Sequence, residues 1–150
     1  NDVKSLEIEI IEGKSVVIDG DTIKIGSEKI RFSGIDAPES YYKGKEQICL
    51  KQNVKIPCGK LSKEFLLQKI NNQKVTCEIE SKPDRYKRKL GECFINNKSL
   101  SRLLVKNGYA FDYPRYSKKK YAKDQEYARA NKLGLWDMKF EFPWDFRKNN

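Results

Sequence analysis

The chain has 150 residues, of which 31 are Lys or Arg and 21 are Asp or Glu, and its net charge is +10. This length suits one domain with one hydrophobic core, so residues 1–150 are expected to form a single domain. Histidine is absent, which excludes Ser-His-Asp and Cys-His hydrolases and histidine-bearing zinc sites. The positive charge attracts nucleic acid, anionic membranes and acidic polysaccharides alike, and a merely soluble basic surface has the same composition.

Short strands are expected over the first part of the chain. Residues 5–11 alternate apolar and charged side chains, which is the period of a half-buried strand. Apolar-rich runs follow at residues 16–18, 22–25 and 29–33, and a Gly-Ser turn separates the last two. Short strands joined by tight turns predict a small barrel or sandwich.

Two acid-rich turns interrupt these strands. Asp19 and Asp21 are two residues apart, and alternate residues of an extended chain share a face. In the second turn, Pro38 favours a bend that directs Asp36 and Glu39 to one side. Because Ca²⁺ prefers carboxylate, carbonyl and water oxygens, the two turns together predict a calcium site. Ordinary turn chemistry, in which Asp and Gly are common, is the alternative for either turn alone.

Two further strands are expected at residues 74–79 and 90–95, with a polar stretch between them. If they form a hairpin centred near Arg85, Cys77 and Cys93 face each other across it. We therefore expect a Cys77–Cys93 disulfide, which would stabilise the fold by about 2–4 kcal/mol.

The other two cysteines, Cys49 and Cys58, flank a short loop and are expected to form a second disulfide, Cys49–Cys58. No two cysteines form a CxxC pair, which argues against a four-cysteine zinc site. Four buried reduced thiols are the alternative.

Three helices are expected among the remaining residues. Apolar side chains recur at helical spacing over residues 61–70. The second helix should run from about residue 99 to 107 with Gly108 as its C-terminal cap, and the third over about residues 118–132. Strands with helices packed on one side make an α+β domain, and a small Greek-key barrel fits this pattern.

The cysteines also bear on where the protein works. Disulfides persist in oxidising compartments, and the chain begins with Asn1 rather than Met, as expected after removal of a leader, although a shortened chain would look the same. No apolar run reaches the roughly 20 residues that a membrane-spanning helix needs. We expect a secreted or periplasmic protein that is not inserted into a membrane.

The ordered motifs resemble those of the thermonuclease, or staphylococcal nuclease-like, family. The resemblance covers about residues 15–137, and secreted, disulfide-bearing members look most similar. It implies an α+β, mainly β fold, a five-stranded OB-type barrel with three helices, which leaves residues 138–150 as a C-terminal extension. The matching segments are residues 17–22, 30–31, 34–39, 84–88, 104–110, 128–129 and 134–136.

By position, the resemblance implies a calcium site within the two acid-rich turns. Asp21 and Asp36 would bind Ca²⁺ together with the backbone carbonyl of Ala37. Asp19 would lie at the edge of the metal site and act through water. These roles agree with the preference of Ca²⁺ for oxygen ligands.

The resemblance also assigns the groups that act on the phosphodiester. Glu39 would be the general base that accepts a proton from the attacking water. Arg31 and Arg88 would stabilise charge on the phosphoryl oxygens through paired hydrogen bonds. Taken singly, Arg31 could instead form a surface salt bridge and Arg88 could be a solvated hairpin charge. The family usually has glycine where this chain has Lys87; if that position requires a positive φ, lysine costs about 1 kcal/mol there and displaces Arg88.

Substrate contacts follow from the same resemblance. Arg85 and Tyr86 match positions that contact a terminal phosphate, and Tyr113 and Tyr116 lie where the family places tyrosines beside the base. The basic run at residues 115–120 could follow the nucleic-acid backbone. Since base stacking and phosphate contacts carry little sequence information, cleavage of DNA and RNA should be largely nonspecific.

The leading hypothesis is a monomeric Ca²⁺-dependent nuclease that breaks the bond between phosphorus and the 5′ oxygen and leaves 3′-phosphate ends. One alternative is a non-catalytic OB-fold module that binds nucleic acid or protein. Another is a basic secreted protein that binds polysaccharide or membranes, which explains the charge but not the ordered acids.

Overall fold

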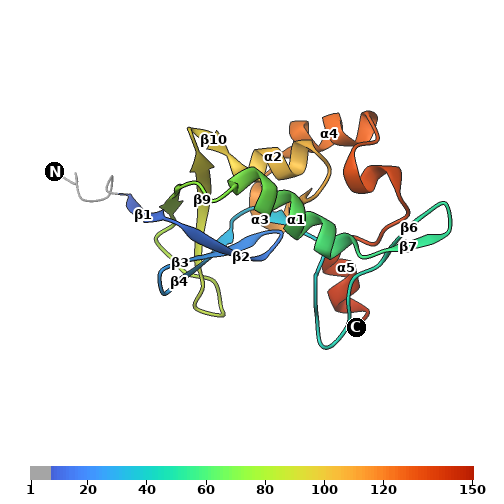
Figure 1. Cartoon of the computed structure of the whole chain (residues 1–150), viewed down its shortest axis with the longest axis horizontal. Helices are drawn as coiled ribbons and strands as arrows, with labels where there is room; N and C mark the ends of the chain where they lie inside the picture. Colours follow the sequence, from blue (N-terminus) through green and yellow to red (C-terminus); the bar gives the residue numbers. More distant parts are fainter. Residues whose placement is uncertain (1–7) are drawn as a thin grey trace.

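The computed structural model describes residues 8–150 and centres on a mixed β-sheet (Figure 1). In space the strands follow the order β1, β8, β9, β4, β3 and β2, and β10 pairs with β9. Strands β4 and β9 are parallel, whereas the other pairs are antiparallel. Strand β1 also contacts β3, so the sheet curls towards a barrel. The strands are β1 (Glu9–Gly13), β2 (Ser15–Asp19), β3 (Thr22–Ile25), β4 (Glu28–Phe32), β8 (Val75–Ile79), β9 (Lys89–Ile95) and β10 (Lys98–Ser99).

Two small sheets lie outside this barrel. Strand β5 (Ile35–Asp36) pairs with β11 (Phe111–Asp112), and β6 (Cys49–Lys51) pairs with β7 (Val54–Ile56) in a hairpin. The first of these matters for function, because it fixes the backbone of one of the predicted acid turns.

The strands expected from the sequence are confirmed, with small shifts at their ends. The strand expected over residues 5–11 is observed from Glu9 onward, and residues 5–7 lie outside the described residues. Strands β8 and β9 form the expected hairpin, in which Cys77 lies directly opposite Cys93.

Helices cover the barrel and continue to the C-terminus (Figure 1). They are α1 (Cys58–Ile70), α2 (Leu100–Lys106), α3 (Pro114–Ser117), α4 (Ala122–Ala130), the 3₁₀ helix η2 (Gly134–Asp137) and α5 (Pro143–Lys148). The first two are the expected helices. Ser99 caps the N-terminus of α2, because its hydroxyl accepts a hydrogen bond from the Arg102 amide.

The third expected helix is shorter than the sequence suggested. Lys118 and Lys119 adopt positive φ angles of 53° and 67°, which a continuous right-handed helix does not allow. The expected helix therefore begins only at Ala122, as α4, and the separate single turn α3 precedes it. Helix α5, in the segment expected only as a C-terminal extension, was not anticipated.

The predicted fold class, an α+β fold on an OB-type barrel, is confirmed. Over residues 8–150 the curled sheet has seven strands rather than five, one of them the two-residue β10. Across the same residues, no helix is both long enough and apolar enough to cross a bilayer.

Both expected disulfides are present. Cys77–Cys93 joins β8 to β9 within the barrel, and Cys49–Cys58 joins the start of β6 to the start of α1. The alternatives of a zinc site and of reduced thiols are wrong, since all four cysteines are paired.

The buried side chains form two clusters. The larger fills the barrel beneath α1 and α2, with Ile23, Ile30 and Phe32 fully buried. The smaller surrounds Phe111 and Leu135 and is closed by aromatic side chains from the C-terminal segment: Trp136, Phe140, Phe142 and Trp144. This second cluster attaches residues 134–146 to the barrel and so positions α5.

Candidate active site

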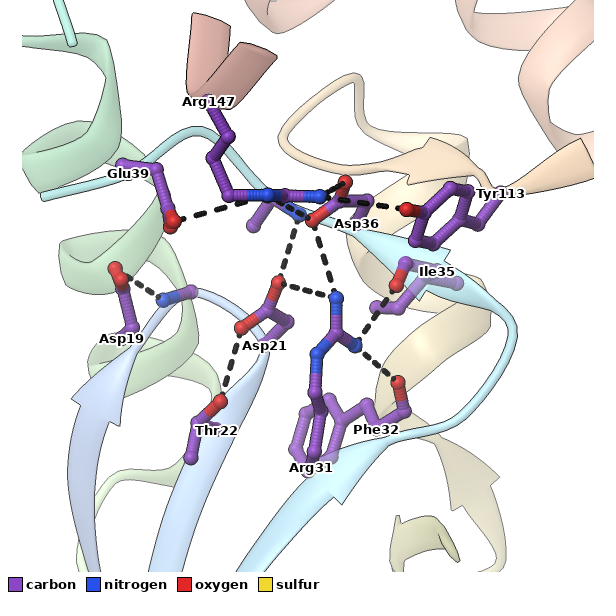
Figure 2. A network of polar contacts seen from close by, with 12 residues as sticks. Asp19, Asp21, Thr22, Arg31, Phe32, Ile35, Asp36, Glu39, Tyr113 and Arg147 are labelled. Atoms are coloured by element: carbon purple, nitrogen blue, oxygen red, sulfur yellow. Dashed lines mark hydrogen bonds and ion pairs between the residues drawn. The ribbon is translucent and has the colours of Figure 1, made fainter. Parts of the chain in front are cut away.

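Four carboxylates and two guanidinium groups converge beside the end of β4 (Figure 2). Asp19 and Asp21 come from the β2–β3 turn, and Asp36 ends β5. Glu39 follows in the next loop, as Figure 2 shows. The two acid-rich turns therefore do face one place, as their sequences predict.

Asp21 ties the two turns together. Its Oδ2 accepts a hydrogen bond of 2.9 Å from the Ala37 amide, and its Oδ1 accepts one of 3.0 Å from the Thr22 hydroxyl. Gly20 allows this approach, because a Cβ there would lie 2.8 Å from Ser62 Cβ and 3.0 Å from Ala37 Cβ.

Asp36 is fully buried and lies between the two guanidinium groups. Arg31 Nη2 is 3.1 Å from Asp36 Oδ1 and 3.4 Å from Asp21 Oδ2. Arg147, on α5, binds both oxygens of Asp36, with Nη1 3.0 Å from Oδ1 and Nη2 2.6 Å from Oδ2. A single buried carboxylate thus accepts hydrogen bonds from two cations.

Arg31 is held by the main chain as well as by acids. Its Nη1 donates to the carbonyl of Phe32 at 2.8 Å and to that of Ile35 at 3.0 Å. Burial would lower the pKa of Arg31, but Asp21 and Asp36 outweigh it and raise that pKa. The guanidinium is therefore charged and fixed in one orientation.

Glu39 is positioned through its backbone. Its amide donates to Gln47 Oε1 at 2.9 Å, and Gln47 in turn donates to the carbonyl of Glu141 at 2.8 Å. The first turn of α1 packs against the Glu39 carbonyl so closely that a Cβ at Gly59 would collide with it. The Glu39 side chain stays 16% exposed and lies 3.6 Å from Arg147 Nη1.

The acids raise one another's pKa values. Burial first, and then the charges of Asp21 and Asp19, raise the pKa of Glu39 to about 7. Burial and Asp21 raise the pKa of Asp19 to about 6, although its Oδ1 accepts hydrogen bonds from the Gly20 and Ser40 amides. Burial also raises the pKa of Asp36 to about 6, against the opposing effect of Arg147. Burial is the main cause of each raised pKa, and the charge of Asp21 adds to it.

The oxygen atoms of this site are of the type that binds a hard cation such as Ca²⁺. Asp21 and Asp36 carry carboxylate oxygens, which Ca²⁺ prefers, but both oxygens of Asp36 accept hydrogen bonds from Arg147, which a bound cation would displace in part. In residues 8–150, no three acidic, cysteine or histidine side chains are already gathered as a metal site. Backbone carbonyls such as that of Ala37, and water, would have to complete the coordination shell, as Ca²⁺ commonly allows.

Arg88 is not among the residues that the structure brings together. Its Nε donates to Asp84 Oδ2 at 2.8 Å, and its guanidinium lies 5.4 Å from the centre of the Tyr86 ring. Among the described residues, Arg88 makes no hydrogen bond or ion pair with Asp21, Asp36 or Glu39. Lys87 has φ of 63°, so this loop does require the left-handed conformation for which the family uses glycine.

The expected substrate residues fall into two groups. Arg85 and Tyr86 lie in the same exposed loop as Arg88, and Arg85 Nη2 donates to the Tyr86 hydroxyl at 2.9 Å. Tyr113 lies at the site, where its hydroxyl is 3.5 Å from Arg147 Nη2, and its ring stacks on Trp144 at 5.2 Å. Tyr116 touches Tyr113 edge to face, and its own ring is exposed.

Arg147 is the site residue that sequence reasoning missed. It lies beyond the recognised motifs and 111 positions from Asp36 along the chain. The aromatic run from Trp136 to Trp144 was the available signal, because such a run predicts that the segment packs against the core rather than extending into solvent.

The chain is similar in sequence to one protein family and to several known proteins. The family described as "Staphylococcal nuclease homologue" matches residues 29–138. The chain is 37% identical to the succinoglycan biosynthesis protein ExoI of Rhizobium meliloti, over 85% of this chain and 65% of that protein. It is 33% identical to the staphylococcal-like nuclease CAN1 of Arabidopsis thaliana, over 81% of this chain and 33% of the relative. It is 34% identical to endonuclease YhcR of Bacillus subtilis, over 87% of this chain and 12% of the relative.

The chain thus spans less than two thirds of the length of each of these relatives. The family match nevertheless covers most of the sequence and includes Arg31, Asp36, Glu39 and Arg88. The protein belongs to the staphylococcal nuclease family.

Proposed function

We propose that the chain is a Ca²⁺-dependent nuclease that cleaves DNA and RNA with little sequence preference. The observation that carries this proposal is the convergence of Glu39, Arg31, Asp21 and Asp36 on one side of the barrel. The net charge of +10 favours capture of a polyanionic substrate. General base, guanidinium and hard-cation ligands are the groups that phosphodiester hydrolysis requires. The name of the Arabidopsis relative, a staphylococcal-like nuclease, agrees with it.

Glu39 is the group that would activate water. Its carboxylate is partly exposed beside Arg147, so a water molecule from solvent can reach it and pass it a proton. The water oxygen forms a bond to phosphorus, its proton passes to the Glu39 carboxylate, and the bond from phosphorus to the 5′ oxygen breaks. The leaving oxygen takes up a proton, so the products are a 3′-phosphate end and a 5′-hydroxyl end.

Arg31 would stabilise the charge that builds on the phosphoryl oxygens. Its main-chain hydrogen bonds hold the guanidinium ready, so little reorganisation is needed during the reaction. Asp21, Asp36 and the Ala37 carbonyl would hold Ca²⁺, which supplies Lewis-acid stabilisation when bound. Asp19 would act from the edge of that site, and Arg88 remains the second arginine that the resemblance assigns.

A digestion assay tests the proposal. Purified protein is incubated with plasmid DNA, single-stranded DNA and RNA, in Ca²⁺ or in EDTA, and the product ends are analysed. We expect Ca²⁺-dependent cleavage that leaves 3′-phosphate ends, and we expect Glu39→Gln to lower the rate by about 10²–10⁴. Glu64→Gln, an exposed glutamate on α1, is the matched control.

Two results would refute the proposal. Full cleavage in EDTA would exclude the role of calcium. Nucleic-acid binding without cleavage would favour a non-catalytic OB-fold module instead.

We also propose that the protein works outside the reducing cytosol. The two disulfides support this location, because disulfides persist in oxidising compartments.

A further inference from the structure

Arg147 lies in the position of a substrate-contacting residue, although it comes from the last helix of the chain. Figure 2 shows it reaching down from α5 between Glu39 and Tyr113, opposite Arg31. The Nη2 of Arg31 and the Nη1 of Arg147 both donate to Asp36 Oδ1, at 3.1 Å and 3.0 Å. Both guanidinium groups therefore point to one place, which the Asp36 carboxylate occupies, and their preference for anionic oxygens also suits a phosphate oxygen there.

The placement of Arg147 is built into the fold. Trp144, three residues earlier, stacks on Phe142 at 4.7 Å and on Tyr113 at 5.2 Å. Phe146 is buried next to it and touches Tyr42 edge to face. Because aromatic contacts fix α5 immediately before Arg147, packing as well as ion pairs sets the direction of its side chain.

The partners of Arg147 differ from those of Arg31 in one important way. Arg31 Nη1 donates hydrogen bonds to two main-chain carbonyls, so this arginine is bound to the backbone. Arg147 binds only side chains of the site, namely Asp36, Glu39 and the hydroxyl of Tyr113. It is also more exposed, at 25% against 13% for the Arg31 side chain. Arg147 can therefore exchange a carboxylate for a phosphate oxygen without disturbing the backbone.

We propose that Arg147 is a catalytic residue of this nuclease, a guanidinium that contacts the scissile phosphate from the solvent side while Arg31 contacts it from the barrel side. The inference rests on the proposed function. The family resemblance assigns the second phosphate-binding arginine to the 84–88 loop, and this inference assigns it to α5. In the loop, Arg88 is bound to Asp84 and makes no hydrogen bond or ion pair with the acids of the site among the described residues.

Steady-state cleavage of a short single-stranded DNA in Ca²⁺ tests the role. We expect Arg147→Ala to lower kcat/KM by about 10²–10³, as removal of one oxyanion-stabilising donor does in other enzymes. Arg147→Lys should recover little of this, because lysine lacks the planar fork. Lys148→Ala is the matched control, since it removes a positive charge from the same helix at an exposed position.

Two further measurements separate contact with substrate from a structural role. Free guanidinium ion at millimolar concentration should raise the rate of Arg147→Ala and not that of the parent protein. Fluorescence anisotropy should show weaker binding of a hydrolysis-resistant phosphorothioate strand by Arg147→Ala, with tryptophan fluorescence of α5 unchanged.

The outcomes distinguish this inference from the proposed function. If the parent protein does not cleave in Ca²⁺, the proposed function fails and the role of Arg147 falls with it. If the parent cleaves and Arg147→Ala retains more than a tenth of its activity, only the inference is overturned. A faster Arg147→Ala would show that Arg147 blocks the site, and a loss that guanidinium does not rescue would show a purely structural role; either result overturns it.

Discussion

Strand β4 and the 84–88 loop hold their arginines in different ways, although they lie next to each other. In the parallel β4–β9 pair, Arg31 is opposite Leu90, so Arg88 comes two residues before the partner of Arg31. Arg31 is bound to carbonyls and carboxylates from several parts of the fold. Arg88 is bound within its own loop, to Asp84 and across the ring of Tyr86.

This difference shows what a motif can and cannot specify. A motif places an arginine at the correct position in the chain, but the contacts made by its side chain decide whether it reaches the site. Arg31 reaches the acids because the carbonyls of Phe32 and Ile35 hold its guanidinium beside them. The Arg147 guanidinium lies against Asp36, and the proposed second contact with the phosphate is assigned to it for that reason.

Among the changes that test the comparison of β4 with the 84–88 loop, the largest effect is expected at Arg31. Arg31→Lys keeps the charge but removes the fork that holds two carbonyls and two carboxylates. Cleavage in Ca²⁺ should fall by about 10²–10³, as loss of an oxyanion donor does. Arg129→Lys, at an exposed arginine paired with Glu126, should leave the rate unchanged. Activity within tenfold of the parent would mean that the rigid arginine is not the essential one.

The next effect is expected where α1 meets the Glu39 backbone. Gly59→Ala places a methyl group against the Glu39 carbonyl, so α1 or the loop must shift. Overpacking of this kind costs about 1–3 kcal/mol of unfolding free energy, and misplacement of the base by about 1 Å can lower the rate by roughly 10². Gly26→Ala is the control: its φ of 59° disfavours alanine, but nothing lies within 4 Å. If Gly59→Ala loses stability and keeps its rate, α1 does not position Glu39.

The parts of the site that the sequence predicted are those that local chemistry determines. Asp19, Asp21, Asp36 and Glu39 lie in turns whose Gly and Pro residues direct the chain, and the structure brings these acids together. The disulfide between β8 and β9 could be predicted because the two cysteines lie at equal distances from the centre of a hairpin. This too depends only on residues close together in the chain.

Arg147 could not be found in this way. Its position depends on Trp144 and Phe142 packing against Tyr113 and Phe111, contacts between residues about 30 positions apart that leave no periodic pattern. The late start of α4 could not be predicted for a related reason. Lysine favours helix, so the sequence gives no sign of the positive φ that Lys118 adopts in the fold.

The smallest effect is expected in the 84–88 loop, and it depends on pH. Burial raises the pKa of Asp84, but hydrogen bonds from Arg88 and the Tyr86 amide outweigh it and hold that pKa below its ordinary value. The ionised carboxylate therefore stabilises the fold above the unfolded pKa of about 3.9, and this contribution is lost as the pH falls through the lower folded pKa.

Asp84→Ala should accordingly lower the unfolding free energy at pH 7 by about 1 kcal/mol. A hydrogen bond to a charged, partly exposed group usually stabilises a protein by about this amount. Denaturant titrations at several pH values measure it, and the difference from the parent should shrink as the pH falls below 4. Asp137→Ala, at an exposed ion pair with Lys51, should show a smaller difference. Because Arg88 is released but Arg31 and Arg147 are untouched, the cleavage rate should change less than tenfold. A loss as large as that of Arg31→Lys would instead place Arg88 at the phosphate, with Asp84 as the residue that positions it.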